Sequence, residues 1–130
     1  MSGLTPLRLR PGEDLRAALQ QWARLHGPGF VVAGIGSLVD AWLRLADQAQ
    51  AGRIEGPLEL LTLSGSLAAD GVHLHASVAD AQGRVRGGHV AAGCVVRTTA
   101  ELLLAPLPDW RLTRVPDADT GYTELVVAPR

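Results

Sequence analysis

The chain has 130 residues, of which 47% are hydrophobic and 19% are charged, a composition that indicates one globular domain and excludes a disordered protein. The formal net charge of -1 excludes a strongly basic protein that would be drawn to nucleic acid or to an anionic membrane by its overall charge. A single cysteine excludes an intrachain disulfide framework.

The N-terminal segment, MSGLTPLRLRPGEDL, predicts no targeting signal. It has no apolar stretch of signal-peptide length, and arginine and acidic residues occur within its first 15 residues. Nor does any stretch of the chain approach the roughly 18 to 20 uninterrupted apolar residues of a membrane span. We therefore expect a cytoplasmic protein with no membrane partner.

The first predicted element is a helix over residues 13–26. Pro11-Gly12 precedes it and Gly27-Pro28 ends it, while acidic residues at 13 and 14 place negative charge in its first turn. Its apolar residues recur at helical spacing and form one stripe that can pack on a sheet: Leu15, Ala18, Leu19, Trp22 and Leu25.

Apolar segments separated by Gly, Pro and Asp clusters predict strands over residues 30–35, 58–67, 72–79, 95–104 and 122–127. One further segment is ambiguous. Apolar residues between 38 and 49 recur at helical spacing, which alone would predict a helix over residues 37–50. Alternation of Ala41, Leu43 and Leu45 fits a strand nearly as well.

Histidines are concentrated in residues 71–94, which hold three of the four in the chain. In the predicted strand, alternation directs His73 and His75 to one face, with their Cα atoms roughly 6.5 to 7 Å apart. Two such imidazoles can share one ion, because a Zn–N bond is about 2.0 to 2.1 Å long. We expect a turn at residues 81–83 and a bend at the glycine pair 87–88 to bring His89 beside them.

The residues alone leave two interpretations of these histidines open, a metal site or a polar strand face without a ligand. Cys94 lies five residues beyond His89 and is either a fourth ligand or, as we expect, a small buried residue. His26 is interpreted as a helix-end residue, since a cation is favourable at a helix C-terminus.

An ordered set of short motifs runs through the chain and resembles the PPC (plants and prokaryotes conserved) domain family. The resemblance implies a single α+β domain over residues 1–130, with a largely antiparallel sheet packed by the N-terminal helix and assembled as a homotrimer. It also favours the strand at 41–45. The matching motifs are RPGEDL (10–15), GIGSL (34–38), GPLELLTLSGSL (56–67), GVHLH (71–75), AD (79–80), Gly83, GGH (87–89), GC (93–94), TAE (99–101) and TGY (120–122).

The chain is most similar to the prokaryotic branch of the family, whose members are usually labelled predicted DNA-binding proteins. That branch carries His-x-His and Gly-Gly-His at these places, so the resemblance implies a metal site at His73, His75 and His89, with zinc as the expected ion and other divalent transition metals as alternatives. Plant members add an Arg-Gly-Arg-Pro hook for A·T-rich DNA; residues 84–88, RVRGG, lack that pattern.

Glu59 and Glu101 are the weak candidates for catalytic residues. Alternation is expected to place Glu59 on the same face as Leu61 and Leu63, so that it interrupts an apolar stripe. Each carboxylate either reaches solvent or pairs with an arginine, and one that approached the histidines would be a candidate general base. The matching glutamate of plant members lies in a stretch that recruits protein partners.

Three functions remain open: a regulator that binds DNA or a protein partner, a metalloprotein that binds or transforms a small ligand, and an assembly scaffold. No dinucleotide fingerprint, P-loop or Gly-x-Ser-x-Gly motif occurs. We expect a DNA-binding, regulatory PPC-like homotrimer with a three-histidine metal site, whose contact with DNA is weak, and more readily a non-enzyme than an enzyme. The alternative is a metal-dependent enzyme of hydrolytic type or a protein that binds a small ligand. Either would use the open coordination position of the metal and would have no DNA role.

Overall fold

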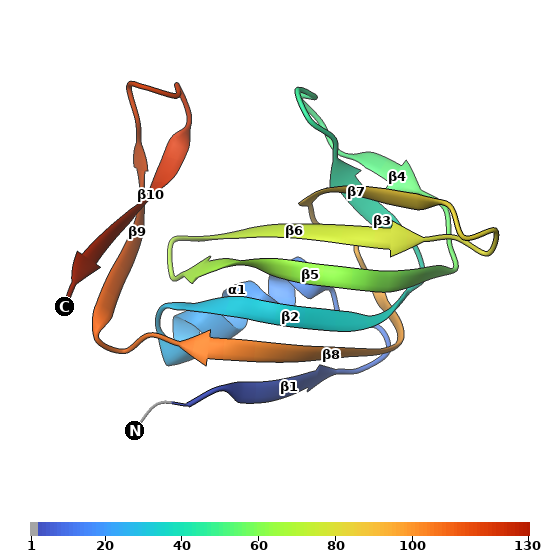
Figure 1. Ribbon diagram of the computed structural model, residues 1–130, viewed down its shortest axis with the longest axis horizontal. Helices are drawn as coiled ribbons and strands as arrows, with labels where there is room; N and C mark the ends of the chain where they lie inside the picture. Colours follow the sequence, from blue (N-terminus) through green and yellow to red (C-terminus); the bar gives the residue numbers. More distant parts are fainter. Residues whose placement is uncertain (1–2) are drawn as a thin grey trace.

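An eight-stranded antiparallel sheet is the main element of the computed structural model, which describes residues 3–130 (Figure 1). The strand order across this sheet is β1-β8-β2-β5-β6-β7-β3-β4, and β9 pairs with β10 in a separate hairpin. The elements are β1 (Thr5–Leu9), α1 (Leu15–His26), β2 (Gly29–Leu38), β3 (Ala41–Arg44), β4 (Gly52–Ile54), β5 (Leu58–Ala68), β6 (Gly71–Ala79), β7 (Val85–Val90), β8 (Val96–Pro106), β9 (Trp110–Pro116) and β10 (Thr123–Pro129). The expected α+β class with a largely antiparallel sheet is confirmed.

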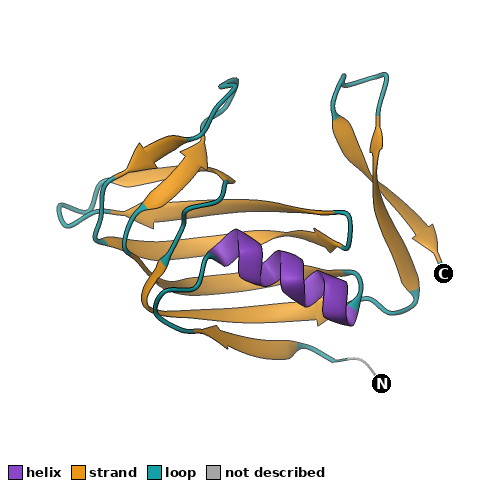
Figure 2. Cartoon of the chain, turned by 180° about the vertical axis from the view of Figure 1, so that it is seen from behind, coloured by secondary structure: helices purple, strands orange, loops and turns teal. Residues whose placement is uncertain are grey.

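Helix α1 covers one face of the sheet and leaves the other face open (Figure 2). Of the predicted apolar stripe, Leu15, Leu19 and Trp22 are buried together with Ala23 and pack on the central strands β5 and β6, whereas Leu25 is exposed. On β6, Val72, Leu74, Ala76 and Val78 are buried while the residues between them are not, except at the strand's end. The face of β6 that carries the histidines is therefore the one turned away from α1.

The predicted start of the helix, at residue 13, was two residues too early. Asp14 is the N-cap, and its Oδ2 accepts a hydrogen bond from the backbone N of Ala17 at 2.9 Å. Its Oδ1 accepts from the backbone N of Gly93 at 2.6 Å, which joins the helix start to the turn before β8. The carboxylate thus caps the helix from outside its first turn. No helix in residues 3–130 is long and apolar enough to cross a membrane.

The five predicted strands are present as β2, β5, β6, β8 and β10, with ends that differ by at most three residues, and the segment at 41–45 forms strand β3 (Ala41–Arg44), as the family resemblance favoured. Strands β1, β4, β7 and β9 were not predicted. Strand β4 has only three residues, and β7 contains a glycine pair and little apolar character. Strands β4 and β7 form because they pair with longer neighbouring strands, and not because of their own residue pattern.

The predicted face of Glu59 was wrong in one respect. The register of β5 against β6 shifts between Leu60 and Thr62, so an irregularity at Leu61 changes the alternation of side chains. Leu63 is buried, whereas Glu59 and Leu61 are exposed. Glu59 therefore reaches solvent near the start of its strand and does not interrupt the apolar stripe.

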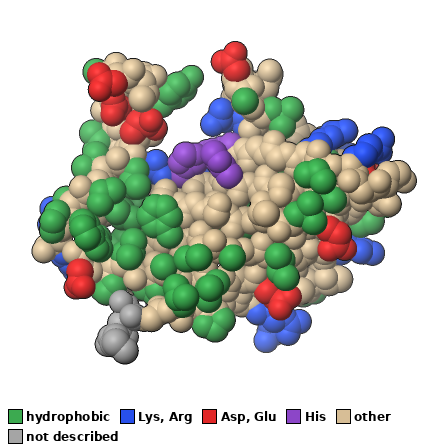
Figure 3. All heavy atoms as spheres, viewed as in Figure 1, with side chains coloured by type: hydrophobic (Ala, Val, Ile, Leu, Met, Phe, Trp, Pro, Cys, Tyr) green, Lys and Arg blue, Asp and Glu red, His purple; other side chains and the backbone are tan. Residues whose placement is uncertain are grey.

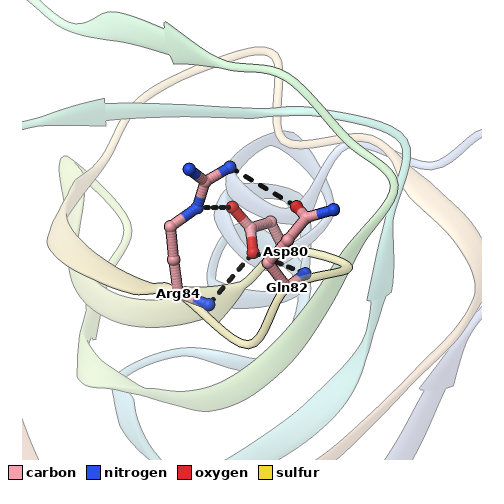
Figure 4. A network of polar contacts seen from close by, with 3 residues as sticks. All are labelled: Asp80, Gln82 and Arg84. Atoms are coloured by element: carbon pink, nitrogen blue, oxygen red, sulfur yellow. Dashed lines mark hydrogen bonds and ion pairs between the residues drawn. The ribbon is translucent and has the colours of Figure 1, made fainter.

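The predicted turn between the histidine-bearing strands is held by Asp80 (Figure 4). One carboxylate oxygen accepts from the backbone N of Gln82 at 2.9 Å and of Arg84 at 3.0 Å. The other accepts from Nε of Arg84 at 2.7 Å. These bonds from Arg84, together with the backbone bond from Gln82, lower the pKa of Asp80. The turn thereby fixes where β7 begins relative to β6.

Gly65 on β5 allows the close approach of the strand that carries the histidines. A Cβ at this position would collide with the carbonyl oxygen of His73. We expect Gly65→Ala to lower the free energy of unfolding by about 1–3 kcal/mol, because the backbones of β5 and β6 must separate. Urea unfolding of both proteins measures this.

Gly52→Ala is the matched control for that experiment, because nothing lies within 4 Å of the added methyl group. It should change the free energy of unfolding by less than about 0.5 kcal/mol. Equal stability of Gly65→Ala and the wild type would contradict the close-packing interpretation.

Candidate metal centre

Two neighbouring strands, β6 and β7, place His73, His75 and His89 together on the face opposite α1. The antiparallel register sets His75 of β6 directly across from His89 of β7. His73 lies two residues before His75 on β6, so its side chain points to the same side. The ring centroids are 4.9 Å apart for His73 and His75, 5.1 Å for His73 and His89, and 5.9 Å for His75 and His89.

The distances between the ring nitrogens fit a shared divalent ion. One ligand nitrogen from each ring can be chosen so that all three lie within 4.8 Å of one another. The Nε2 atoms of His73 and His75 are 3.2 Å apart. Two imidazole nitrogens on a tetrahedral zinc ion lie about 3.3 Å apart, since each Zn–N bond is about 2.0 to 2.1 Å. The separation of the third nitrogen from the other two therefore has to shorten by at most about 1.5 Å.

The glycine pair beside His89 does not act as the predicted hinge. Gly87 and Gly88 lie within strand β7, and neither has a positive φ. A Cβ on Gly88 would lie 2.8 Å from the carbonyl oxygen of Arg44, and one on Gly87 would lie 3.1 Å from that of Ala76. The two glycines therefore allow β3 and β6 to approach β7 closely, and regular strand pairing alone brings His89 to the other histidines.

Burial and positive charge keep two of the three imidazoles neutral. Burial, followed by the charge of Arg44, lowers the pKa of His89 from 6.5 to about 4. Burial, followed by the charge of Arg114, lowers the pKa of His73 below the same ordinary value. Because the neutral imidazole is the form that binds a metal, these rings are ready to act as ligands at neutral pH.

The carboxylates proposed as catalytic candidates lie elsewhere. Glu59 and Glu101 line a separate pocket of about 550 Å³ together with Arg97. Ser64 on β5 is the residue paired with His75 on β6, and Glu59 lies five residues before Ser64 on the same strand. That offset corresponds to roughly 15 Å along the strand. The structure therefore brings the two carboxylates near one another but not to the histidines.

Cys94 and His26 have the structural roles expected for them. Cys94 is fully buried, and its Sγ contacts the backbone N and O of Trp42 at 3.3 and 3.4 Å. Burial raises the pKa of its thiol, which opposes the thiolate form that binds metals. His26 stacks on Trp22 with ring centroids 4.7 Å apart, and its Nδ1 lies 3.0 Å from the Trp22 carbonyl oxygen in the last turn of α1.

An open pocket of about 840 Å³ adjoins the histidines, between the β9–β10 hairpin and the loop after β3. We call it the hairpin pocket. His73 and His89 line it together with Arg44 and Arg114, two residues that the sequence patterns did not single out. Figure 3 shows the histidines in a hollow between two raised segments, with cationic side chains on both sides. Arg114 lies 41 positions beyond His73 in the chain, so no local pattern joins them.

Comparison with known proteins gives the family. The model of the Plants and Prokaryotes Conserved (PCC) domain, the family abbreviated PPC above, matches residues 4–108. The chain is 52% identical over 126 residues to a bifunctional protein GlmU of a Synechococcus strain. That alignment covers 95% of this chain but 20% of the GlmU protein, so the chain spans about a fifth of the curated relative.

Solved structures show the same fold. A hypothetical protein from Salmonella cholerae-suis has a TM-score of 0.94 and 36% identity, with 100% of this chain and 96% of that one covered. A metal-containing protein from Archaeoglobus fulgidus has a TM-score of 0.80 and 25% identity, covering 97% and 95%. A candidate DNA-binding protein from Bacteroides thetaiotaomicron has a TM-score of 0.84 and 17% identity, covering 97% and 93%, a similarity of fold alone. The chain belongs to the Plants and Prokaryotes Conserved domain family.

Proposed function

We propose that this chain is a metal-binding member of its family, in which His73, His75 and His89 hold one divalent transition metal ion, with zinc as the expected ion. The observation that carries this proposal is the convergence of three ring nitrogens within 4.8 Å on one rigid sheet face. The Archaeoglobus fulgidus neighbour, a metal-containing protein, supports it. With three protein ligands, such an ion keeps a position open and supplies Lewis acidity to a bound molecule.

The functional unit of this proposal includes residues 109–130, beyond the segment matched by the family model. Arg114 on β9 and Glu124 on β10 line the hairpin pocket beside the histidines. Backbone and side-chain bonds attach this hairpin to the sheet, because Arg114 donates to Asp70 and to Ser66. We therefore treat residues 1–130 as one unit that presents the histidines at the floor of a pocket.

Binding of small ligands is favoured over DNA binding as the use of this site. The net charge of the chain is -1. Arg84, one of the few clustered arginines, is engaged by Asp80 at 2.7 Å within its own turn. DNA contact remains a second candidate that rests on the fold shared with candidate DNA-binding proteins. Any such contact would involve few phosphates and depend only weakly on salt concentration.

Replacement of one ligand tests the metal site. His75→Ala should abolish stoichiometric metal binding, because the two remaining imidazoles hold zinc far more weakly than three. Metal content is measured by mass spectrometry on protein purified without an affinity tag. His26→Ala, at the end of α1, is the control and should keep one ion per chain. Full zinc stoichiometry in the His73→Ala/His75→Ala/His89→Ala triple variant would refute the site.

The lowered histidine pKa values make the stability of the metal-free protein depend on pH. The unfolded chain takes up a proton at residue 89 near pH 6.5, whereas the folded chain does so only near pH 4. Between these values the unfolded state binds more protons, so the free energy of unfolding falls as the pH falls through this window. Thermal unfolding at about pH 7, 6 and 5 should show this decline, with a smaller decline in His89→Gln. Identical pH profiles for the two proteins would show that residue 89 does not titrate in this way.

We also expect a homotrimer, as the family resemblance implies. Large apolar side chains are exposed on the sheet face that α1 does not cover, among them Val32 at 51% and Ile35 at 54%. Figure 3 shows hydrophobic side chains gathered on this face. Burial of such side chains between subunits would stabilise an assembly. Sedimentation equilibrium should give three times the monomer mass of 13.7 kDa.

A charge on the uncovered face should dissociate this assembly. We expect Val32→Asp/Ile35→Asp to sediment as a monomer, whereas Leu25→Asp should stay trimeric because residue 25 is 69% exposed on the helix, at the opposite side of the sheet. A wild-type chain that sediments as a 13.7 kDa monomer at all concentrations would contradict the proposal.

A further inference from the structure

The hairpin pocket has the size and the residues of a small-molecule site. Its volume of about 840 Å³ lies within the range of roughly 300–1,000 Å³ that such sites occupy. Arg44, from the end of β3, and Arg114, from β9, reach it from separate segments. Arg44 is paired with His89 across β3 and β7, and Arg114 donates to Ser66, the residue paired with His73 across β5 and β6. The two guanidinium groups thus lie on two sides of the candidate metal centre.

Neither guanidinium is neutralised by a carboxylate. Within residues 3–130, the ion pairs shorter than 4.0 Å are Arg53–Asp40 and Arg84–Asp80, both outside this pocket. Arg114 is instead oriented by a neutral partner, because its Nη2 donates to Oγ of Ser66 at 2.7 Å. Ser66 is only 6% exposed, so this contact is fixed by the core of the sheet. The remaining donors of Arg114 are available to a ligand.

Arg44 is held more loosely than Arg114. Its Nη1 donates to the carbonyl oxygen of Gln48 at 3.3 Å, within the loop that forms one wall of the pocket. Among the described residues, no carboxylate forms an ion pair with Arg44 within 4.0 Å. A planar guanidinium with free donors matches a carboxylate or a phosphate, to which it can give two parallel hydrogen bonds.

Acidic residues in the same pocket restrict which anion would fit. Asp70 accepts a hydrogen bond from the backbone N of Arg114 at 3.0 Å and is therefore engaged. Asp47 and Glu124 line the walls without an ion pair to either arginine. Their negative charges would repel a polyanion that passes over the pocket, such as a nucleic-acid backbone, so only an anion that contacts the two guanidinium groups directly would fit.

We propose that Arg44 and Arg114 bind the carboxylate or phosphate group of a small organic anion, held in the hairpin pocket beside the metal-binding histidines. This inference rests on the proposed metal site and names the class of ligand that the site takes. One anionic group contacts the guanidinium groups, and a second polar group of the same molecule reaches the open position of the metal. One attachment point is the arginine pair and the other is the metal ion. Together they select for a short molecule with a polar group at each end.

Calorimetric titration with two simple probes tests the proposal. Inorganic phosphate and malonate are each titrated into zinc-loaded protein, freed of excess metal, and into metal-free protein. We expect saturable binding of at least one probe to the loaded protein. Tighter binding of phosphate would identify a phosphorylated ligand, and tighter binding of malonate a carboxylate ligand. Absence of saturable binding of both probes to fully loaded protein would overturn the proposal.

Charge-removing variants assign the binding to the two arginines. Arg44→Gln and Arg114→Gln should each weaken the preferred probe by about tenfold, the effect of losing one charge-assisted hydrogen bond. Arg111→Gln is the matched control, because this exposed arginine lies on the same strand but outside the pocket. Equal affinity in the wild type and in both pocket variants would also overturn the proposal. Thermal unfolding of each variant checks that it is folded.

The same titrations separate this inference from the metal proposal. His75→Ala should hold no stoichiometric metal, but its arginines should still bind the probe, more weakly than in the wild type. Adding Arg114→Gln to His75→Ala should weaken probe binding further. If no metal binds even to the wild type while the arginine variants still lose affinity, the metal proposal fails and the anion site stands. If metal binds but the arginine variants behave as the wild type, the anion site fails alone.

Discussion

The register between β6 and β7 is the constraint on which the candidate site depends. Antiparallel pairing places His75 directly opposite His89, and the two-residue repeat of a strand places His73 on the same face. A shift of one residue would direct both histidines of β6 into the apolar layer under α1. Two features hold the register. The buried residues of β6 pack under the helix, and Asp80 closes the turn through bonds to Gln82 and Arg84.

The two faces of the sheet differ in what they contribute: one forms the core and the other carries the candidate site. The face under α1 supplies the apolar core and the rigidity, with Leu60, Leu63 and Leu74 at most 2% exposed. The other face carries the histidines near one end of β6 and exposed apolar side chains over β2. A single helix of 12 residues cannot cover both faces. The uncovered face is therefore available to a metal, a ligand or further subunits. Similarity to one fifth of a GlmU protein shows that a domain of this kind also occurs within longer polypeptides.

Electrostatics around the histidines follow from burial and from unpaired arginines together. Partial burial disfavours the imidazolium form of His89, and the nearby Arg44 disfavours it further, so the pKa falls to about 4. The same two arginines form the proposed anion site in the hairpin pocket. A neutral imidazole and an uncompensated guanidinium are the forms that bind a cation and an anion respectively, and here they are neighbours. The proposed metal ion and the proposed anionic ligand would thus lie side by side, whereas Glu59 and Glu101 line a separate pocket.

The sequence by itself determined the fold class, most of the longer strands, the helix and the pairing of His73 with His75 on one face. The fold class follows from the ordered motifs that resemble the family, whereas the helix, the longer strands and the histidine pair follow from helical spacing and local alternation, which α1 and β6 display clearly. Tertiary structure alone decided the rest. Strands β4 and β7 exist through their neighbours, Gly87 and Gly88 serve close packing instead of bending, and an irregularity at Leu61 turns Glu59 to solvent. Arg44 and Arg114 reach the histidines only because distant segments meet across the sheet, and no periodicity along a chain records such long-range contacts.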